Sequence, residues 1–228
     1  MSAPTVLFDL GNVLVRLALE RGVEQLQALA GPSAPASLDA ARVFFDKAAL
    51  ACNKGELAPD AFLEELGRLL GGALARERLA EAWCTIFDPY PEMEALAGEV
   101  LDLGHRAYLV SNTDPLHFAH LWPRIPVLRR LSGLHLSYEV GLLKPDPAFM
   151  RAALSRFGLD PARCAYLDDR PENVRAAEGL GVPSHLHDVA AGAAGVEGAR
   201  AFLRRQGVAV RQSAPPCAES SATRTKLS

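Results

Sequence analysis

The sequence predicts an α/β fold, with a parallel sheet of about five strands, helices on both faces of the sheet, and a helical cap inserted after the first strand. Two observations predict this arrangement. Short apolar segments alternate with segments of helical periodicity, which is typical of buried parallel strands joined by crossover helices. One long stretch near the amino terminus interrupts the alternation, because every pattern in it is helical.

The strands are expected in five short runs of apolar and β-branched residues. Along the chain they are TVLFDL (5–10), RAYLVS (106–111), LHLS (134–137), CAYLDD (164–169) and PSHLH (183–187). Helical periodicity between them predicts crossover helices in PEMEALAGEVLDLG (91–104), PAFMRAALSRFG (147–158) and ENVRAAEGLG (172–181). Each helical segment ends in a glycine, the residue favoured just after a helix. Strands and helices in this order predict a Rossmann-like core.

The insertion lies between Leu17 and Phe87, where four helical patterns follow one another without a convincing strand. The segment Asp88-Pro89-Tyr90-Pro91 marks its end, because each proline disfavours helix in the residue before it. The final segment of the chain is small, polar and without periodicity, which predicts disorder. The predicted domains are an α/β core (1–16 and 89–206), a helical cap (17–88) and a disordered tail (207–228).

Composition argues against several classes of function. The net charge is −3 and the lysines and arginines are scattered, so neither nucleic acid nor a membrane surface is an expected partner. No run approaches the ~20 apolar residues that span a membrane. The first apolar run is short and contains Asp9, unlike a signal peptide. The four cysteines form no CxxC pair, which favours reduced thiols. We expect a cytoplasmic protein that is a monomer or a weak homo-oligomer.

Polar residues stand where the predicted strands end. Asp9 ends the first strand, Ser111-Asn112-Thr113 the second and Asp168-Asp169 the fourth, while Lys144 lies in GLLKPDP after the third. Singly, such residues are typical of helix caps and turns. Together they would meet at one edge of the sheet, where ligands bind in open α/β folds. Adjacent carboxylates repel each other and gain most from a bound cation, so the set predicts a functional site.

The segments FDLGNV, LVSNT, GLLKPDP and YLDDRPEN, in this order, resemble the four motifs of the haloacid dehalogenase (HAD) superfamily, and the similarity spans residues 5–187. The helical insertion resembles that superfamily's cap. A first motif of the DxG form, together with SNTDPLH and a nearby Trp-Pro, resembles the branch that includes α-D-glucose-1-phosphate phosphatase. The resemblance implies a Mg²⁺-dependent phosphomonoester hydrolase whose substrate is a small phosphorylated metabolite, such as a sugar phosphate.

The resemblance also implies catalytic and substrate-binding roles at this edge. Asp9 would attack phosphorus to form an aspartyl-phosphate. Lys144 would neutralise the charge of the transferring phosphoryl group, to which Ser111 and Asn112 would donate hydrogen bonds. The catalytic residues would therefore be Asp9 and Lys144, and the substrate-binding residues Ser111, Asn112 and Lys144.

A metal site is implied by the same resemblance, since hard oxygen ligands suit Mg²⁺. The implied ligands are the carboxylates of Asp9 and Asp169 and the backbone carbonyl of Gly11. Asp168 would be a further ligand or an outer residue, and Asn173 would orient the set. Such a cation, together with Lys144, would supply the counter-charge that lets an acid interrupt an apolar strand run.

Gly11 departs from the superfamily's pattern, since most of its phosphatases have a second Asp two residues after the nucleophile. That Asp protonates the leaving group and later activates water, which glycine cannot do. A general acid–base contributes roughly 10²–10⁴-fold to a rate. His117 or an acid from the cap could replace it, but a histidine on a helix face often only packs. The charged cap residues are expected mainly at the solvated surface: Glu20, Asp46, Lys47, Lys54 and Glu56.

Two other functions stay open at this point. A metal-independent 2-haloacid dehalogenase would not need the missing acid, because halide leaves without a proton. Such enzymes typically carry an aromatic residue at the position of Gly11, however, and the pair Asp168 and Asp169 fits a metal site better. The third reading is a non-catalytic binding protein with this fold, although only one catalytic group is missing.

Overall fold

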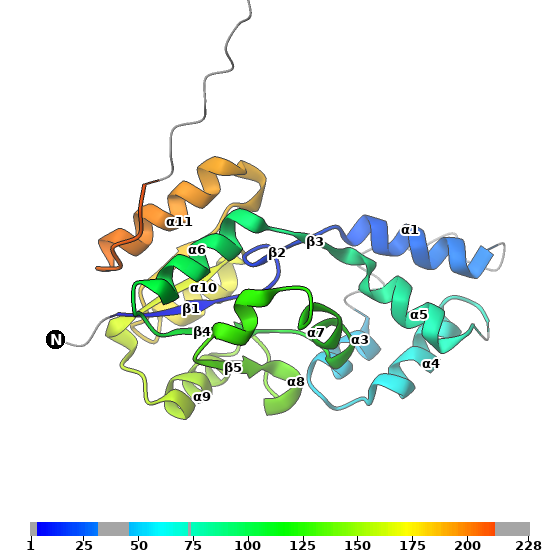
Figure 1. Ribbon diagram of the computed structural model, residues 1–228. Helices are drawn as coiled ribbons and strands as arrows, with labels where there is room; N and C mark the ends of the chain where they lie inside the picture. The colour runs from blue at the N-terminus through cyan, green and yellow to red at the C-terminus, as the bar shows by residue number, and fades with distance from the viewer. Residues whose placement is uncertain (1–3, 32–45, 73, 213–228) are drawn as a thin grey trace, which may run out of the picture.

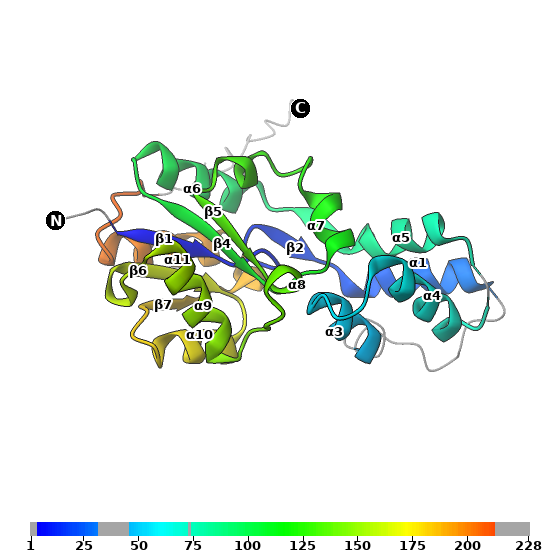
Figure 2. The ribbon, with the colours of Figure 1, turned by 90° about the horizontal axis from the view of Figure 1, so that it is seen from below.

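Figure 1 shows the computed structural model of the chain, in which residues 4–31, 46–72 and 74–212 are described. A twisted parallel sheet with helices on both sides forms one part of the molecule, and a group of helices forms the other. The view in Figure 2, turned by 90°, shows the same two parts side by side. These features confirm the predicted α/β class with a five-stranded parallel sheet.

The sheet consists of β1 (Thr5–Phe8), β4 (Ala107–Ser111), β5 (Gly133–Leu136), β6 (Cys164–Asp168) and β7 (Ser184–Leu186). Its strand order is β5-β4-β1-β6-β7, and all neighbours are parallel. The last residue of the central strand β1, Phe8, pairs with Leu109 on one side and with Leu167 on the other. Asp9 therefore directly follows the central strand, and β4 and β6 end beside it.

Helices cover both faces of the sheet. The helices of this part are α6 (Pro91–Asp102), α7 (Pro115–Leu121), α8 (Ser137–Val140), α9 (Pro147–Phe157), α10 (Pro171–Glu178), α11 (Ala193–Arg205) and the 3₁₀ helices η3 (Pro126–Arg130), η4 (Pro161–Arg163) and η5 (Val189–Ala191). Successive strand side chains point to opposite faces. Val6 and Phe8 consequently join the apolar cluster formed with α6 and α11, whereas Leu7 joins the cluster formed with α9 and α10.

The helical part has an apolar core of its own, which includes Leu26, Phe62, Leu70 and Trp83. Its helices are α1 (Leu19–Ala30), α3 (Lys47–Asn53), α4 (Pro59–Leu69), α5 (Arg76–Trp83) and the 3₁₀ helix η2 (Cys84–Ile86). The sequence predicts one helical pattern over residues 37–52, of which residues 37–45 lie outside the described residues. The loop after α3 approaches α8 closely at Gly55, where a Cβ would collide with the Tyr138 carbonyl oxygen.

An antiparallel ribbon joins the two parts, and sequence reasoning missed it. β2 (Val15–Leu17) pairs with β3 (Phe87–Pro89), and Leu17 lies opposite Phe87. The expectation of purely helical patterns between the first two strands was therefore wrong at both ends of the insertion. Strands of three residues are too short to show a period of two, and this pair forms only because the chain returns after the whole insertion.

The prediction of a disordered tail from residue 207 was also wrong at its start. Val208 and Val210 are buried in the apolar cluster that covers one face of the sheet. The backbone N–H of Val208 donates to the Leu203 carbonyl at 3.0 Å, which turns the chain back after α11. Two valines separated by one residue were enough to anchor this segment. Residues 213–228, the rest of the predicted tail, lie outside the described residues.

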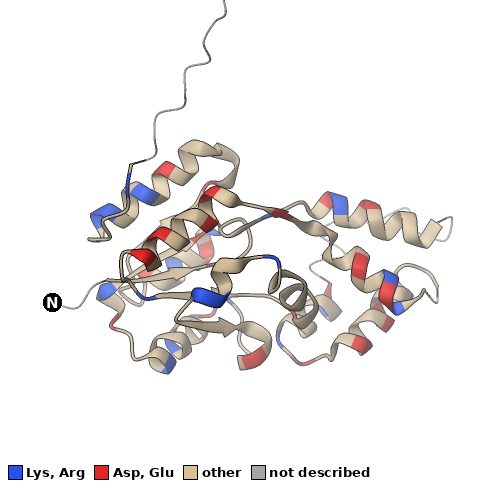
Figure 3. Ribbon diagram, in the orientation of Figure 1, with Lys and Arg blue, Asp and Glu red and all other residues tan. Residues whose placement is uncertain are grey.

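Charged side chains are distributed over the whole molecule. Figure 3 shows residues of both signs in each of the two parts. Many of these charges form exposed pairs, such as Arg68 with Glu65 and Arg130 with Asp102. No helix in the described part of the chain is both long and apolar enough to cross a membrane.

Candidate active site

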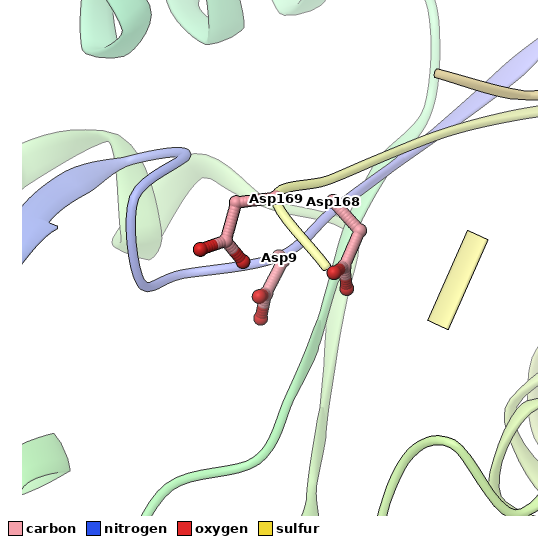
Figure 4. Close-up of side chains that lie close together, drawn as sticks. All are labelled: Asp9, Asp168 and Asp169. Carbon is pink, nitrogen blue, oxygen red and sulfur yellow. The ribbon is translucent and has the colours of Figure 1, made fainter. Parts of the chain in front are cut away.

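Three acids meet beyond the carboxyl ends of β1 and β6. Figure 4 shows that the side chains of Asp9, Asp168 and Asp169 lie close together. One carboxylate oxygen of each lies within 4.8 Å of those of the other two. β1 and β6 pair in parallel, with Phe8 opposite Leu167, so the residues that follow this pair emerge at one edge. The structure thus brings together three acids that the sequence singled out.

Lys144 links two of these acids. Its Nζ atom lies 2.8 Å from Asp9 Oδ1 and 2.7 Å from Asp168 Oδ2, and all three residues are buried. Burial raises the pKa of Asp9 to about 7, although the charge of Lys144 opposes the shift. Burial alone would lower the pKa of Lys144, but Asp9 and Asp168 outweigh it and raise that pKa. The lysine therefore stays an ammonium ion between two carboxylates.

Asp168 is fully buried and surrounded by donors. Its carboxylate accepts hydrogen bonds from Lys144, from the Tyr166 hydroxyl, from the Arg170 N–H at 2.8 Å and from Asn173 Nδ2 at 2.9 and 3.1 Å. Burial raises the pKa of Asp168, but Lys144 and these hydrogen bonds outweigh burial and lower the pKa. Both carboxylate oxygens are engaged, so Asp168 is arranged to hold Lys144 rather than to bind a cation directly.

Asp169 is more accessible, and its surroundings fit a cation. Asn12 Nδ2 donates to Asp169 Oδ2 at 2.9 Å, while Asn12 Oδ1 accepts from the Leu17 N–H at 3.0 Å. Three carboxylates face one ammonium here, which leaves two negative charges uncompensated when all are ionised. A divalent cation with oxygen ligands would compensate them, so the donor set fits Mg²⁺. Asp9, Asp169 and the Gly11 carbonyl are the groups that could hold it.

Ser111 and Asn112 lie at the end of β4 beside the acids. Ser111 is buried, and its hydroxyl makes a long hydrogen bond, 3.3 Å, to the Asn112 carbonyl. The Asn112 side chain turns to the backbone of Lys144: Nδ2 donates to the carbonyl and Oδ1 accepts from the N–H, both at 2.9 Å. Asn112 therefore holds the loop that carries Lys144 in position. The second hydrogen of its side-chain amide is left to donate to a ligand.

Gly11 lies beside the side chain of Leu17, which belongs to the ribbon that leads to the cap. A Cβ placed on Gly11 would lie 3.0 Å from Leu17 Cδ1 and 3.5 Å from Leu17 Cγ. The backbone does not require glycine here, because the positive φ of this turn, 54°, falls on Asn12. An apolar side chain thus fills the space that an acid at position 11 would enter.

His117 has both ring nitrogens engaged away from the acids. Nδ1 lies 2.8 Å from Asp114 Oδ2, and Nε2 lies 3.0 Å from the Trp83 carbonyl oxygen. The ring stacks on the Trp83 indole at 4.9 Å, and the indole N–H donates to Asp114 Oδ2 at 3.1 Å. These contacts fasten α5 to α7, so the geometry favours the packing role over the role of a replacement acid.

A cavity of about 490 Å³ opens onto the acids, and residues of both parts of the molecule line it. Its volume suits a small-molecule ligand. The sheet edge contributes charged and polar groups: Asp9, Asn12, Ser111, Asn112, Thr113, Lys144, Asp169, Arg170 and Asn173. The cap and its ribbon contribute mainly apolar side chains.

Sequence reasoning missed two residues of this site. The Tyr166 hydroxyl contacts both Asp168 and Lys144, the latter at 3.2 Å. A signal for it existed, because residues two apart on a strand share a face, and Tyr166 stands two residues before Asp168. Asn12, which contacts Asp169, also had a signal: Gly-Asn is a common turn pair, and asparagine tolerates positive φ.

The chain is similar to phosphatases of known name. It is 26% identical over 189 residues to D-ribitol-5-phosphate phosphatase of Bacteroides thetaiotaomicron, which covers 77% of this chain and 87% of that protein. It is 35% identical over 139 residues to phosphoserine phosphatase of Thermus thermophilus, which covers 59% of this chain and 55% of that protein.

A solved structure shares the fold. It is that of a HAD family enzyme of Bacteroides thetaiotaomicron in complex with magnesium and inorganic phosphate. The two chains are 24% identical and superpose with a TM-score of 0.74, over 82% of this chain and 96% of the other. The family described as haloacid dehalogenase-like hydrolase matches residues 3–181, most of the sequence. The chain therefore belongs to the haloacid dehalogenase-like hydrolases.

Proposed function

We propose that this hydrolase is a Mg²⁺-dependent phosphomonoesterase that acts on a small phosphorylated metabolite through an aspartyl-phosphate at Asp9. The observation that carries the proposal is the buried ion pair of Asp9 with Lys144, at 2.8 Å, beside two further acids. The similar proteins with established names support it, since both are named for small phosphate esters.

In the proposed reaction, Asp9 attacks the phosphorus atom, a P–O bond joins the phosphoryl group to Asp9, and the bond to the ester oxygen breaks on the opposite side. The departing alkoxide takes its proton from solvent water. Water then attacks the aspartyl-phosphate, which releases inorganic phosphate and restores the carboxylate. Lys144 offsets the charge of the phosphoryl oxygens, and the Ser111 hydroxyl donates to one of them. Asp168 keeps the Lys144 ammonium charged and oriented.

Asp9, Asp169 and the Gly11 carbonyl hold Mg²⁺ in this proposal, and the bound cation supplies positive charge against both the acids and the phosphate. Asn12 orients Asp169 through its hydrogen bond of 2.9 Å. The same Asn12 side chain accepts a hydrogen bond from the backbone N–H of Leu17. One residue therefore contacts both the proposed metal ligand Asp169 and the ribbon that leads to the cap.

A direct test is phosphate release from a panel of esters, with Mg²⁺ and with excess EDTA. The panel contains p-nitrophenyl phosphate, α-D-glucose-1-phosphate, a pentitol phosphate and phosphoserine. We expect release with Mg²⁺ and none in EDTA. Full activity in EDTA, with halide release from 2-haloacids, would support a dehalogenase instead. Phosphate or Mg²⁺ binding without any release would support the non-catalytic alternative.

We expect Asp169→Asn to raise the Mg²⁺ concentration for half-maximal rate by at least roughly 10–100-fold, the effect known for groups around a metal. Asp168→Asn should change that concentration less, because its carboxylate is already occupied by Lys144, Tyr166 and Asn173. A magnesium titration of the two variants, with thermal unfolding as the control for folding, gives the comparison. A larger shift for Asp168→Asn would reverse the assignment.

The proposed reaction lacks a side chain that protonates the leaving alcohol. Among the described residues that line the cavity, the carboxylates are Asp9 and Asp169, which already have other roles, and His117 has both nitrogens engaged. Rates should therefore depend steeply on the leaving group, and esters with good leaving groups should react fastest.

We expect Gly11→Asp, combined with Leu17→Ala, to raise kcat/KM for simple alkyl phosphates by up to roughly 10²–10⁴-fold, the contribution of a general acid. The second substitution removes the carbons that would crowd the new Cβ. Aryl phosphates should gain less, because a phenolate leaves without a proton. Leu17→Ala alone is the matched control. If a folded, Mg²⁺-binding double variant gained nothing on alkyl esters, another residue would already supply the proton.

The finer substrate prediction rests on the resemblance of the first motif, SNTDPLH and the nearby Trp-Pro to the α-D-glucose-1-phosphate phosphatase branch. A sugar phosphate therefore stays a prediction, and the panel above tests it directly. The lining of the cavity argues against a hydroxyl-rich alcohol and for a different class of substrate.

A further inference from the structure

We propose that the preferred substrate is a phosphate monoester of a largely apolar alcohol or phenol, held against an apolar roof that the cap and its ribbon provide. This inference rests on the phosphatase function proposed above. The apolar roof consists of Leu17, Leu19, Leu50, Ile86 and Phe87, all of which line the cavity that opens onto the acids.

The roof is assembled from three segments that are far apart in the sequence. Leu17 and Leu19 lie at the junction of β2 with α1, Leu50 lies on α3, and Phe87 begins β3. Leu17 pairs with Phe87 across the ribbon, which sets two roof side chains on one piece of backbone. The cap thus contributes mainly apolar side chains to the cavity, and the charged groups of the lining come from the edge of the sheet.

Leu50 marks the roof as a surface that a ligand would cover. The residue is 41% exposed, although α3 is otherwise anchored by buried Ala49 and Cys52. The other exposed large apolar residues in the described part of the chain are Leu103, Trp122 and Leu186, and none of them lines the cavity. Contact with an apolar ligand would remove Leu50 from water, which favours binding.

The roof offers little to a charged or hydroxyl-rich group. Among the described cap residues that line the cavity, Asn53 carries an amide and Trp83 an indole N–H, which already donates to Asp114; none carries a charge. Lys54 pairs with Glu56 at 2.7 Å outside the lining. A second phosphate, a carboxylate or an ammonium would find no opposite charge on these cap residues, and several hydroxyls would lose water with only the Asn53 amide to replace it.

Leu17 extends the same apolar character to the reaction centre. Its Cδ1 atom lies 3.0 Å from the position that a Cβ on Gly11 would occupy, and Gly11 is two residues after Asp9. The carbon atoms of the leaving group next to the ester oxygen would therefore touch leucine rather than an acid. The absence of a side chain at position 11 makes room for Leu17 beside Asp9, so the apolar surface extends to the reaction centre.

The test on the unmodified protein uses phenyl phosphates with a para substituent, since these leaving groups differ little in acidity. The series carries methyl, propyl and pentyl groups, and a 2,3-dihydroxypropyl group gives a polar ester of the same carbon number as propyl. We expect kcat/KM to rise by up to about fourfold per methylene until the cavity is filled. The propyl ester should exceed the dihydroxypropyl ester by at least about tenfold.

A pair of variants tests the roof itself. Leu50→Gln should lower the ratio of kcat/KM for the propyl ester to that for the dihydroxypropyl ester by at least about threefold, because it replaces roof carbons with an amide. Leu103→Gln is the matched control: it makes the same change at a leucine that is 45% exposed outside the cavity. Leu103→Gln should leave the ratio at its wild-type value.

The outcomes separate this inference from the function on which it rests. Release of phosphate from p-nitrophenyl phosphate, with a flat or falling alkyl series or a preference for the dihydroxypropyl ester, would overturn the apolar substrate class and leave the phosphatase intact. Equal ratios in Leu50→Gln and Leu103→Gln would also overturn it. No release from any ester in the presence of Mg²⁺ would instead contradict the proposed function.

Discussion

Replacing Asp9 with Asn is expected to abolish phosphate release, with kcat lower by at least about 10⁴-fold, the scale seen when a covalent nucleophile is removed. An amide keeps the shape of the side chain but cannot form the aspartyl-phosphate. The fold should persist, because the substitution removes a carboxylate whose burial raises its pKa to about 7. Initial rates with p-nitrophenyl phosphate and a thermal unfolding curve are the two measurements.

Asp102→Asn is the matched control for this experiment. Asp102 is an exposed carboxylate that pairs with Arg130 at the surface, so its loss should leave the rate and the unfolding temperature unchanged within error. If Asp9→Asn kept a rate comparable to that of Asp102→Asn while remaining folded, Asp9 would be removed from the mechanism.

Lys144→Met is expected to lower the free energy of unfolding by about 3–5 kcal/mol and to remove activity as well. Methionine fills a similar volume but leaves the buried carboxylates of Asp9 and Asp168 without their ammonium. Urea unfolding in the absence of Mg²⁺ measures the loss. Lys54→Met is the control, since Lys54 pairs with Glu56 at the surface. This substitution should lower the free energy of unfolding by less than about 1 kcal/mol.

A second substitution separates the two effects of Lys144. Asp168→Asn in the Lys144→Met background removes one of the stranded charges, so the double variant should be more stable than the sum of the single losses predicts. Activity should not return, because the ammonium proposed to face the phosphoryl group is still missing. Simple addition of the two losses would mean that the pair is not coupled and that Lys144 has another structural role.

The sequence alone determined the sheet and the identity of the acids at its edge. Alternation of apolar and helical segments predicts parallel strands, and parallel strands end at one edge, so Asp9, Asp168 and Lys144 had to approach one another. The structure has this arrangement, with Lys144 within 2.8 Å of both acids. These features were predictable because they depend on local patterns and on topology, both of which a linear sequence expresses.

Only the tertiary structure decided what each side chain faces. Asn112 turns to the backbone of Lys144, 32 residues away, and His117 turns to Trp83 in the cap, 34 residues away. Asp168 and Asp169 are adjacent acids in the sequence. In the structure, hydrogen-bond donors contact both carboxylate oxygens of Asp168, and this distinguishes it from Asp169.

The direction of side chains was also not predictable in the cap. Its sequence indicates helices but does not indicate which of their side chains face the acids. Leu17 meets Gly11, and Leu50 faces the cavity, only because the ribbon and α3 bring them there. A side chain's direction depends on packing between segments distant in the sequence, and no local period records that packing. The sequence therefore determined which residues gather at the edge of the sheet, and the tertiary structure determined which of their atoms face the cavity.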